Sequence, residues 1–281
     1  MAGGYLQMDE TPIEYLSPGN GETRTGYFWT VFRPGEDGFY QWETSRAAEC
    51  IKRIIPVDFR GHLQCDAYAG YGSFVRQQQG INLVGCWAHV RRKFFEAKEQ
   101  APTQAGWILN QIRHLYRIEK ELREKKVSAT IREVVRAHQA APICARIFAA
   151  LDKMNLKGSF LPRSNMGKAI YYALSNWNLL EVYLKQGQVE IDNNLVENAI
   201  RPTAVGKKNW LFIGDADAGQ RSAVLFTIIE CCRRRGINPY EYLRDVLSKL
   251  PTSTTSQIKD LTPKAWAKAG EVKVSPLKKA A

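Results

Sequence analysis

The spacing of apolar residues changes after Trp87, and this change constrains the fold more than any other feature. Before it, short segments rich in aromatic and β-branched residues dominate the chain. Residues 88–186 instead repeat apolar side chains at helical spacing and contain few strand signals. With 281 residues, the chain can bury a sizeable core. The pattern predicts an α/β protein with a mixed sheet, an all-helical insertion and a small helical C-terminal element.

Individual elements follow from local patterns. Thr44 or Ser45 is expected to cap a helix that stops at Pro56, and the turn at residues 34–38 is expected to join a hairpin. Strands are expected over residues 5–9 with a continuation to 16, and over 26–32, 39–43, 61–65 and 81–85. Outside the insertion, helices are expected over residues 46–55, 68–79, 222–235 and 239–250, and from 192 or 194 toward 201.

Two segments lack a clear apolar face. The arginine-rich stretch 113–136 is interleaved with glutamates, which favours a solvated helical face. From Pro251 the chain is rich in Ser, Thr, Lys and Ala and has little to bury, so residues 251–281 are expected to form a flexible basic tail.

The charge balance points to a polyanionic partner. The chain carries 40 basic and 28 acidic residues, a net charge of +12, with a pI near 9.4. Nucleic acid is the first partner to consider for so basic a chain. Apolar runs such as Ala223–Ile229 are too short to span a bilayer, no secretory signal is expected, and six scattered cysteines without a CxxC motif favour a reducing cytoplasm.

Three acidic residues stand out by their placement. Asp9 lies in or just after the first predicted strand, and Asp66 lies where a later predicted strand ends. If these two strands are parallel neighbours, both carboxylates lie at one edge of the sheet. Glu197 lies on a predicted helix far downstream. Three converging carboxylates form a site for Mg²⁺ or Mn²⁺, and two such ions can activate a water or a 3′-hydroxyl for attack on a phosphodiester.

Each acid also has a purely structural interpretation. Asp9 could end a strand, and Asp66 could cap the helix after it. Glu197 could complete a capping box with Asn194 or form an ion pair with Arg201. Asp192 competes with Glu197 as the third ligand.

Other motifs suggest metal and phosphate contacts. Cys86 and His89 have the spacing of two zinc ligands, although no second pair follows, and a buried thiol beside a packed imidazole is the simpler interpretation. Arg91, Arg92 and Lys93 form a compact basic cluster for which we predict phosphate contacts. Downstream, a second predicted DNA-binding group consists of Arg201, Lys207, Lys208 and Trp210, although Trp210 would fit a core equally well.

Together, these segments resemble the DDE-type transposases of the insertion sequence 66 family of bacterial mobile elements. The resemblance runs from about Tyr5 to Leu250, and the order and spacing of its segments make it specific. The segments are Met8-Asp-Glu-Thr-Pro12, Gln64-Cys-Asp-Ala-Tyr-Ala-Gly-Tyr71, Gly85-Cys-Trp-Ala-His-Val-Arg-Arg-Lys-Phe94, Ile191-Asp-Asn-Asn-Leu-Val-Glu197, Ala199-Ile-Arg-Pro202 and Lys207-Lys-Asn-Trp-Leu-Phe212.

The resemblance implies a ribonuclease H-like fold and assigns the catalytic, metal-binding triad to Asp9, Asp66 and Glu197 with two Mg²⁺ or Mn²⁺ ions. It implies DNA cleavage and strand transfer on transposon ends and target DNA, in a bacterial, nucleoid-associated setting. A homo-oligomer and element-encoded helper proteins are the expected partners. The implied parts are a catalytic core over residues 1–95 and 187–214, a helical insertion over 96–186 and a C-terminal element over 215–250.

The chain departs from the family pattern at two points. It has Asn198 where the family usually has an arginine after the third acid, and Asp9 lies almost at the N-terminus. We therefore expect a catalytic domain without the family's usual N-terminal region of coiled-coil and DNA-recognition parts. The alternatives are a catalytically inactive DNA-binding remnant and a host nuclease or resolvase of the same fold.

Overall fold

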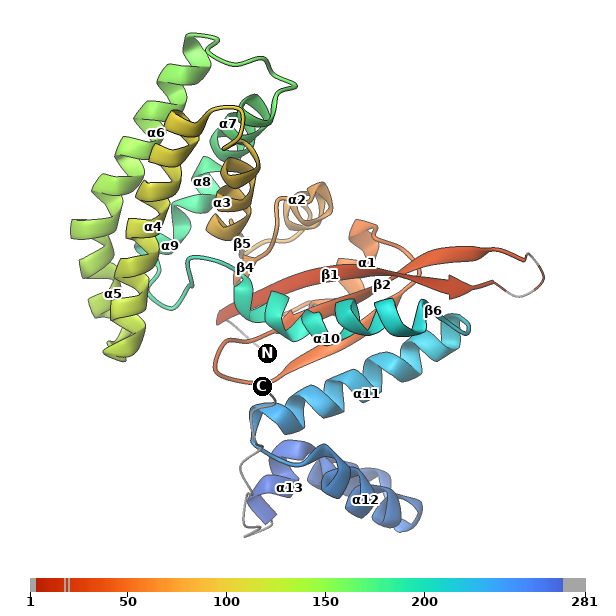
Figure 1. Cartoon of the computed structure of the whole chain (residues 1–281). Helices are drawn as coiled ribbons and strands as arrows, with labels where there is room; N and C mark the ends of the chain where they lie inside the picture. The colour runs from red at the N-terminus through yellow and green to blue at the C-terminus, as the bar shows by residue number, and fades with distance from the viewer. Residues whose placement is uncertain (1–3, 18, 20, 270–281) are drawn as a thin grey trace. The chain divides into compact units, whose positions relative to one another are not determined.

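The computed structural model describes residues 4–17, 19 and 21–269 and combines a mixed sheet with many helices (Figure 1). This confirms the predicted α/β class. The strands are β1 (Gly4–Leu16), β2 (Thr23–Phe32), β3 (Gly38–Glu43), β4 (Gly61–Gln64), β5 (Ile81–Val84) and β6 (Phe212–Ile213). The α-helices are α1 (Ala48–Ile54), α2 (Ala69–Arg76), α3 (Trp87–Glu96), α4 (Pro102–Glu124), α5 (Ala129–Val135), α6 (Ala141–Leu156), α7 (Asn165–Ser175), α8 (Trp177–Leu180), α9 (Val182–Lys185), α10 (Asn194–Trp210), α11 (Ala216–Arg234), α12 (Pro239–Lys249) and α13 (Pro263–Ala269). A π-helix, η1 (Arg136–Ala140), and two 3-10 helices, η2 (Leu250–Thr252) and η3 (Thr255–Leu261), complete the order.

The sheet has the strand order β3-β2-β1-β4-β5, and β6 pairs with β1. Strands β2 and β3 are antiparallel, with Phe32 opposite Gly38, which confirms the predicted hairpin. Strand β1 is parallel to β4, with Gln7 opposite Gln64, and β4 is parallel to β5. The parallel pairing that would bring Asp9 and Asp66 to one edge is therefore present for β1 and β4, although Asp9 lies within β1 and not at its end.

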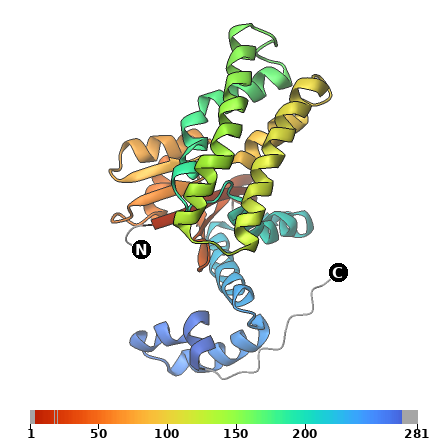
Figure 2. The same ribbon diagram turned by 90° about the vertical axis from the view of Figure 1, so that its left-hand side faces the viewer.

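The chain forms two compact units, and the first comprises Met1–Met8 and Ala47–Glu197. One continuous apolar core, which includes Trp87, Phe94 and Ile108, joins its helices to β5 and the start of β1. Helix α3 packs against α4 and α7, and α6 packs against the same two helices, as Figure 2 shows from the side. The predicted helical segment is thus part of a shared core with the parallel strands.

The second unit comprises Asp9–Arg46 and Asn198–Ala281. Helix α11 packs on β3, and Gly219 allows the close approach because a Cβ there would lie 2.2 Å from Trp42 Cε2. The core beneath α11 contains Phe28, Tyr40 and Trp42. None of the described helices is both long and apolar enough to cross a bilayer.

Three local expectations are corrected. Neither Thr44 nor Ser45 caps α1, which begins after Ala47 without a side-chain cap and has Glu49 in its first turn, where a carboxylate favours the helix dipole. Helix α10 does not end near Arg201 but passes through Pro202 to Trp210. Proline removes the hydrogen bond to the carbonyl of Asn198, but this residue is exposed and water can replace the lost donor.

The expectation of a flexible tail over residues 251–281 is wrong for the part of the tail that the structure describes. The segment after Pro251 contains η2, η3 and α13 as far as Ala269, whereas residues 270–281 lie outside the described residues. The indole of Trp266 donates a 2.7 Å hydrogen bond to Asp245 and packs edge-on against Tyr242, with 5.6 Å between the ring centroids. Trp266 therefore attaches the segment after Pro251 to α12, a contact that the polar composition of the segment does not predict.

Candidate active site

Asp66 lies just beyond the carboxyl end of β4. Its side chain is half-buried, and its Oδ1 accepts a 3.0 Å hydrogen bond from the backbone N–H of Tyr68. Tyr68 is the N-cap of α2, and no side chain caps the helix directly. The turn thus fixes the direction in which the Asp66 carboxyl leaves the sheet.

Glu197 lies in the first turn of α10, and its carboxylate faces α3. Its Oε2 lies 3.6 Å from Arg92 Nη2, and its Oε1 lies 3.8 Å from His89 Nδ1. The Glu197 side chain is 25% exposed. Within the described part of the chain, Oε1 is buried and accepts no hydrogen bond, so this oxygen is available to a further partner.

His89 connects Asp66 and Glu197 electrostatically. Burial is the largest influence and lowers the pKa of His89, and the charges of Arg92 and Lys93 add to this effect. The carboxylates of Glu197 and Asp66 oppose it. Both acids therefore act on one imidazole, which remains neutral near pH 7 because its pKa lies below the usual value of 6.5.

Cys86, His89 and Glu197 each contribute a ligand atom to a cluster in which these atoms lie within 4.8 Å of one another. Burial raises the pKa of the Cys86 thiol to about 12. A sulfur, a nitrogen and an oxygen are donors that zinc accepts, whereas Mg²⁺ prefers oxygen ligands alone. The cluster thus brings the predicted CxxH pair to Glu197, but with a mixed donor set.

Asp9 is the first residue of the second unit and directly follows the buried Met8 on β1. Its Oδ1 accepts a 3.0 Å hydrogen bond from the backbone N–H of Glu10. The Glu10 side chain is 1% exposed and forms an ion pair with Arg46. Glu10 is thus committed to a salt bridge, and Asp9 beside it on β1 is half-exposed.

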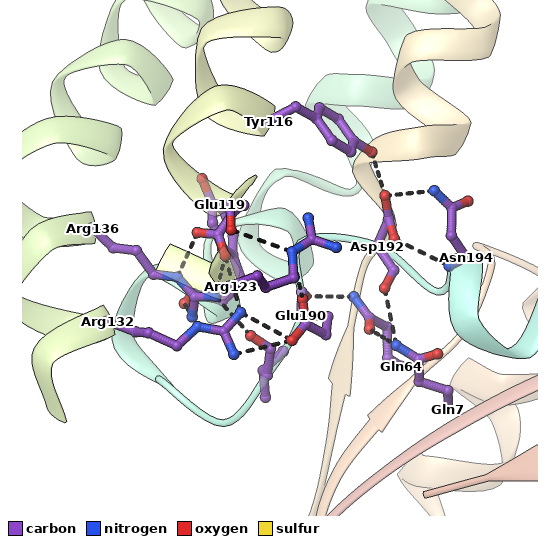
Figure 3. Close-up of polar contacts among 12 residues, drawn as sticks. Gln7, Gln64, Tyr116, Glu119, Arg123, Arg132, Arg136, Glu190, Asp192 and Asn194 are labelled. Atoms are coloured by element: carbon purple, nitrogen blue, oxygen red, sulfur yellow. Dashed lines mark hydrogen bonds and ion pairs between the residues drawn. The ribbon is translucent and has the colours of Figure 1, made fainter. Parts of the chain in front are cut away.

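The loop that leads into α10 is held on one side by residues of α4, α5 and η1 (Figure 3). Arg136 is fully buried and donates to both carboxylate oxygens of Glu119, each at 2.7 Å. It also donates to the backbone carbonyls of Tyr183, Gln186 and Val189. Arg132 bridges Glu119 and Glu190, with 3.0 Å to each carboxylate. Glu119, Arg132, Arg136 and Glu190 are hereafter the charged clamp.

Two buried amides hold the same loop from the sheet side (Figure 3). Gln64 Nε2 donates to the carbonyl of Glu190 at 2.9 Å, and Gln7 Nε2 donates to the carbonyl of Asp192 at 3.0 Å. Gln7 Oε1 in turn accepts from the N–H of Val196 at 3.2 Å. The loop before Glu197 is therefore fixed from both sides.

Asp192, which competes with Glu197 on sequence grounds, has its carboxylate engaged. It is 5% exposed and accepts 2.7 Å and 2.8 Å hydrogen bonds from Tyr116 Oη and Asn194 Nδ2, and a third from the N–H of Asn194. Its role is to anchor the start of α10 to α4.

The charged clamp corrects the expected solvated face of residues 113–136. Arg136 is 0% exposed and the Arg132 side chain is 12% exposed, so both belong to the interior. Burial acts to raise the pKa of Glu119, but the hydrogen bonds and charges of Arg136 and Arg132 outweigh it and hold this pKa below the usual range. A signal was present in the sequence, because Glu119 interrupts the apolar repeat of α4.

The predicted DNA-binding residues fall into both units. On α3, Arg91 and Arg92 are exposed, whereas Lys93 is half-buried with Nζ 4.7 Å from the centroid of the Tyr172 ring. In the second unit, Arg201 and Lys208 are exposed, Lys207 Nζ donates to the carbonyl of Pro12 at 3.1 Å, and Trp210 is 37% exposed beside a pocket lined by Phe212 and Phe226.

Comparison with known proteins places these features in a family. Residues 1–221 match the model of the transposase IS66 family, and residues 227–264 match the IS66 C-terminal element. Two proteins of Sinorhizobium fredii (strain NBRC 101917 / NGR234), the uncharacterized proteins y4qI and y4jD, are each 32% identical to the chain, over 271 and 280 residues. These alignments cover 91% and 94% of the chain but 49% and 54% of the relatives, so the chain spans about half the length of the curated relatives it matches. The family model covers well over half of the sequence, and the chain therefore belongs to the IS66 family of transposases.

Proposed function

We propose that the chain is a DDE-type catalytic domain of ribonuclease H-like fold that cleaves DNA strands and joins them to target DNA. The mixed strand order supports this fold, with β1, β4 and β5 parallel on one side and the β2–β3 hairpin on the other. The proposed catalytic residues are Asp9, Asp66 and Glu197.

The observation that carries the proposal is that Glu197, 131 positions after Asp66 in the sequence, lies with its Oε1 3.8 Å from Nδ1 of His89, an imidazole whose pKa the charges of both acids raise against the effect of burial. The parallel register supports Asp9, because Asp9 and Asp66 each lie two residues beyond the opposed pair Gln7 and Gln64. The family resemblance assigns the same three residues.

The donor chemistry fits divalent metal ions. Carboxylate oxygens are the preferred ligands of Mg²⁺ and Mn²⁺, and the buried Oε1 of Glu197 accepts no hydrogen bond in the described part of the chain. Asp9, Asp66 and Glu197 would hold two such ions, which supply charge for activating a hydroxyl and stabilising a leaving oxygen. His89 and Arg92 orient the Glu197 carboxylate from α3.

Basic side chains would hold the DNA. We propose phosphate contacts by Arg91, Arg92, Arg201 and Lys208 and, with less of the side chain free, by Lys93 and Lys207. Trp210 is proposed to contact a base or sugar. Homo-oligomers and helper proteins in the DNA complex are part of the same proposal.

The test is nicking and joining of supercoiled DNA by the full chain with Mg²⁺, with Mn²⁺ and with a chelator. Asp66→Asn should reduce the rate at least about 100-fold, because even partners that only support a metal ligand change activity 10- to 100-fold. Asp58→Asn, at an exposed aspartate of the same unit, should leave it unchanged. Activity that survives Asp66→Asn rejects the triad.

The alternative is a catalytically inactive DNA-binding remnant, and the same assay distinguishes it from a catalytic domain. A remnant would bind DNA with strong salt dependence and show no Mg²⁺-dependent nicking. Cleavage of branched DNA without joining would instead indicate a nuclease or resolvase.

A further inference from the structure

A basic cavity lies between α3 and α4 in the first unit. Its volume is about 800 Å³, within the range of sites that enclose a ligand of a few hundred daltons. It reaches Asn194, the first residue of α10, three positions before Glu197. The cavity is therefore next to the proposed catalytic centre.

The lining carries four cations and, among the described lining residues, no carboxylate. They are Arg91, Arg92, Lys98 and Arg113. Within the described part of the chain, Arg92 alone of the four forms an ion pair, with Glu197 at 3.6 Å. Concentrated positive charge without matching acids favours a polyanionic ligand.

An aromatic side chain lies among these cations. Phe95 lines the cavity and is 61% exposed, whereas the neighbouring Phe94 is fully buried in the core. Phe95 lies four and three positions after Arg91 and Arg92, so it shares one face of α3 with them, and Lys98 follows in the turn after the helix. Aromatic side chains in a positively charged groove are the pattern with which proteins hold unpaired nucleic acid strands.

The combination of basic side chains and an exposed aromatic ring favours unpaired DNA over duplex DNA. In a duplex, the faces of the bases are stacked on one another, so an aromatic ring can stack only on an unpaired base. Resting on the proposed function, which supplies DNA as substrate, we propose that this cavity binds an unpaired segment of the DNA strand beside the catalytic acids. Phe95 stacks on a base, and Arg91, Lys98 and Arg113 contact the flanking phosphates.

The test is fluorescence anisotropy with the full chain in the presence of a chelator, so that binding is measured without catalysis. The probes are a labelled oligo(dT) of about 15 nucleotides and a duplex of equal length. Phe95→Ala should weaken binding of the single strand about tenfold or more and change duplex binding less than about twofold. Phe95→Tyr should restore single-strand binding. Tyr171→Ala, at a 73% exposed aromatic residue of the same unit outside the lining, should have no effect.

A second variant tests the phosphate contacts. Arg113→Gln should lower the slope of log affinity against log salt for the single strand by about 0.7. Arg117→Gln, at an exposed arginine of α4 outside the lining, should leave the slope unchanged. Equal losses for duplex and single strand after Phe95→Ala, or unchanged affinity, overturn the proposal, as does an RNA oligonucleotide that competes better than its DNA equivalent.

The two proposals fail separately. If Asp66→Asn retains nicking but Phe95→Ala selectively loses single-strand binding, the catalytic assignment is wrong and the cavity assignment stands. If nicking depends on Asp66 but single-strand binding is unchanged by Phe95→Ala and Arg113→Gln, the catalytic assignment stands and the cavity assignment is wrong.

Discussion

Replacing Arg136 with methionine tests whether the charged clamp stabilises the first unit. Arg136 is 0% exposed and makes five hydrogen bonds, two to the Glu119 carboxylate and three to backbone carbonyls. The variant leaves Glu119 buried with Arg132 as its remaining ion-pair partner and leaves three carbonyls without this donor. Breaking a buried pair costs about 3–5 kcal/mol, and we expect a loss in this range.

The assay is urea unfolding followed by far-ultraviolet circular dichroism, with hydrogen exchange of the 186–193 loop as the local measurement. The unfolding midpoint should fall by about 1–2 M urea. Lys120→Met is the matched control, because Lys120 forms an ion pair with Glu124 on the surface of α4, with side chains that are 73% and 62% exposed. An exposed pair of this kind contributes about 0–1 kcal/mol.

A second replacement identifies the cause of the loss. Glu119→Leu combined with Arg136→Met removes both charges, so the double variant should be more stable than Arg136→Met alone. If Arg136→Met costs less than about 1 kcal/mol, or if the double variant is the less stable of the two, an uncompensated buried charge is not the main cost.

Two further predictions concern the same unit. Because the pKa of Glu119 is held below its usual value of 4.5, its stabilising contribution is present above about pH 4.5 and is lost as the pH falls through the lowered pKa. The free energy of unfolding should therefore decline less steeply with falling pH in Glu119→Gln than in the unmodified chain. Equal slopes for the two proteins would contradict this prediction. Gly187→Ala should destabilise the unit by at least about 1–3 kcal/mol, because a Cβ there would lie 1.9 Å from the Ala129 carbonyl oxygen. Gly106→Ala, in the second turn of α4 with open space around its Cβ, should instead stabilise it by up to about 1 kcal/mol in thermal unfolding.

The sheet could be predicted from sequence because its signals are local. Alternating apolar residues and the turn at residues 34–38 define the β2–β3 hairpin, and short apolar runs define β4 and β5. The same reasoning placed Asp66 after a strand that is parallel to β1. The division of the chain into a core and a helical insertion stays a prediction.

The charged clamp could not be predicted in the same way. Arg132 and Arg136 lie in a stretch whose composition matches a solvated helix. They become interior residues through contacts with Glu119 in the same stretch and with Glu190 and backbone carbonyls of a distant one. The cavity could not be predicted from local sequence either, because its lining residues Phe95 and Arg113 lie on two different helices. Interactions of this kind depend on tertiary packing, and the sequence carries only the one signal of Glu119 within the apolar repeat of α4.

The buried contacts of α4, α5 and η1 with the loop before Glu197 limit how this segment could be exchanged with that of a relative. A segment over residues 102–140 taken from a relative would fit this core only if it brought a matching acid and two matching arginines at the positions of Glu119, Arg132 and Arg136. A glutamate at position 190 and a glycine at position 187 would also have to be kept. Chimeric transposases should therefore exchange residues 102–140 and the 186–193 loop together.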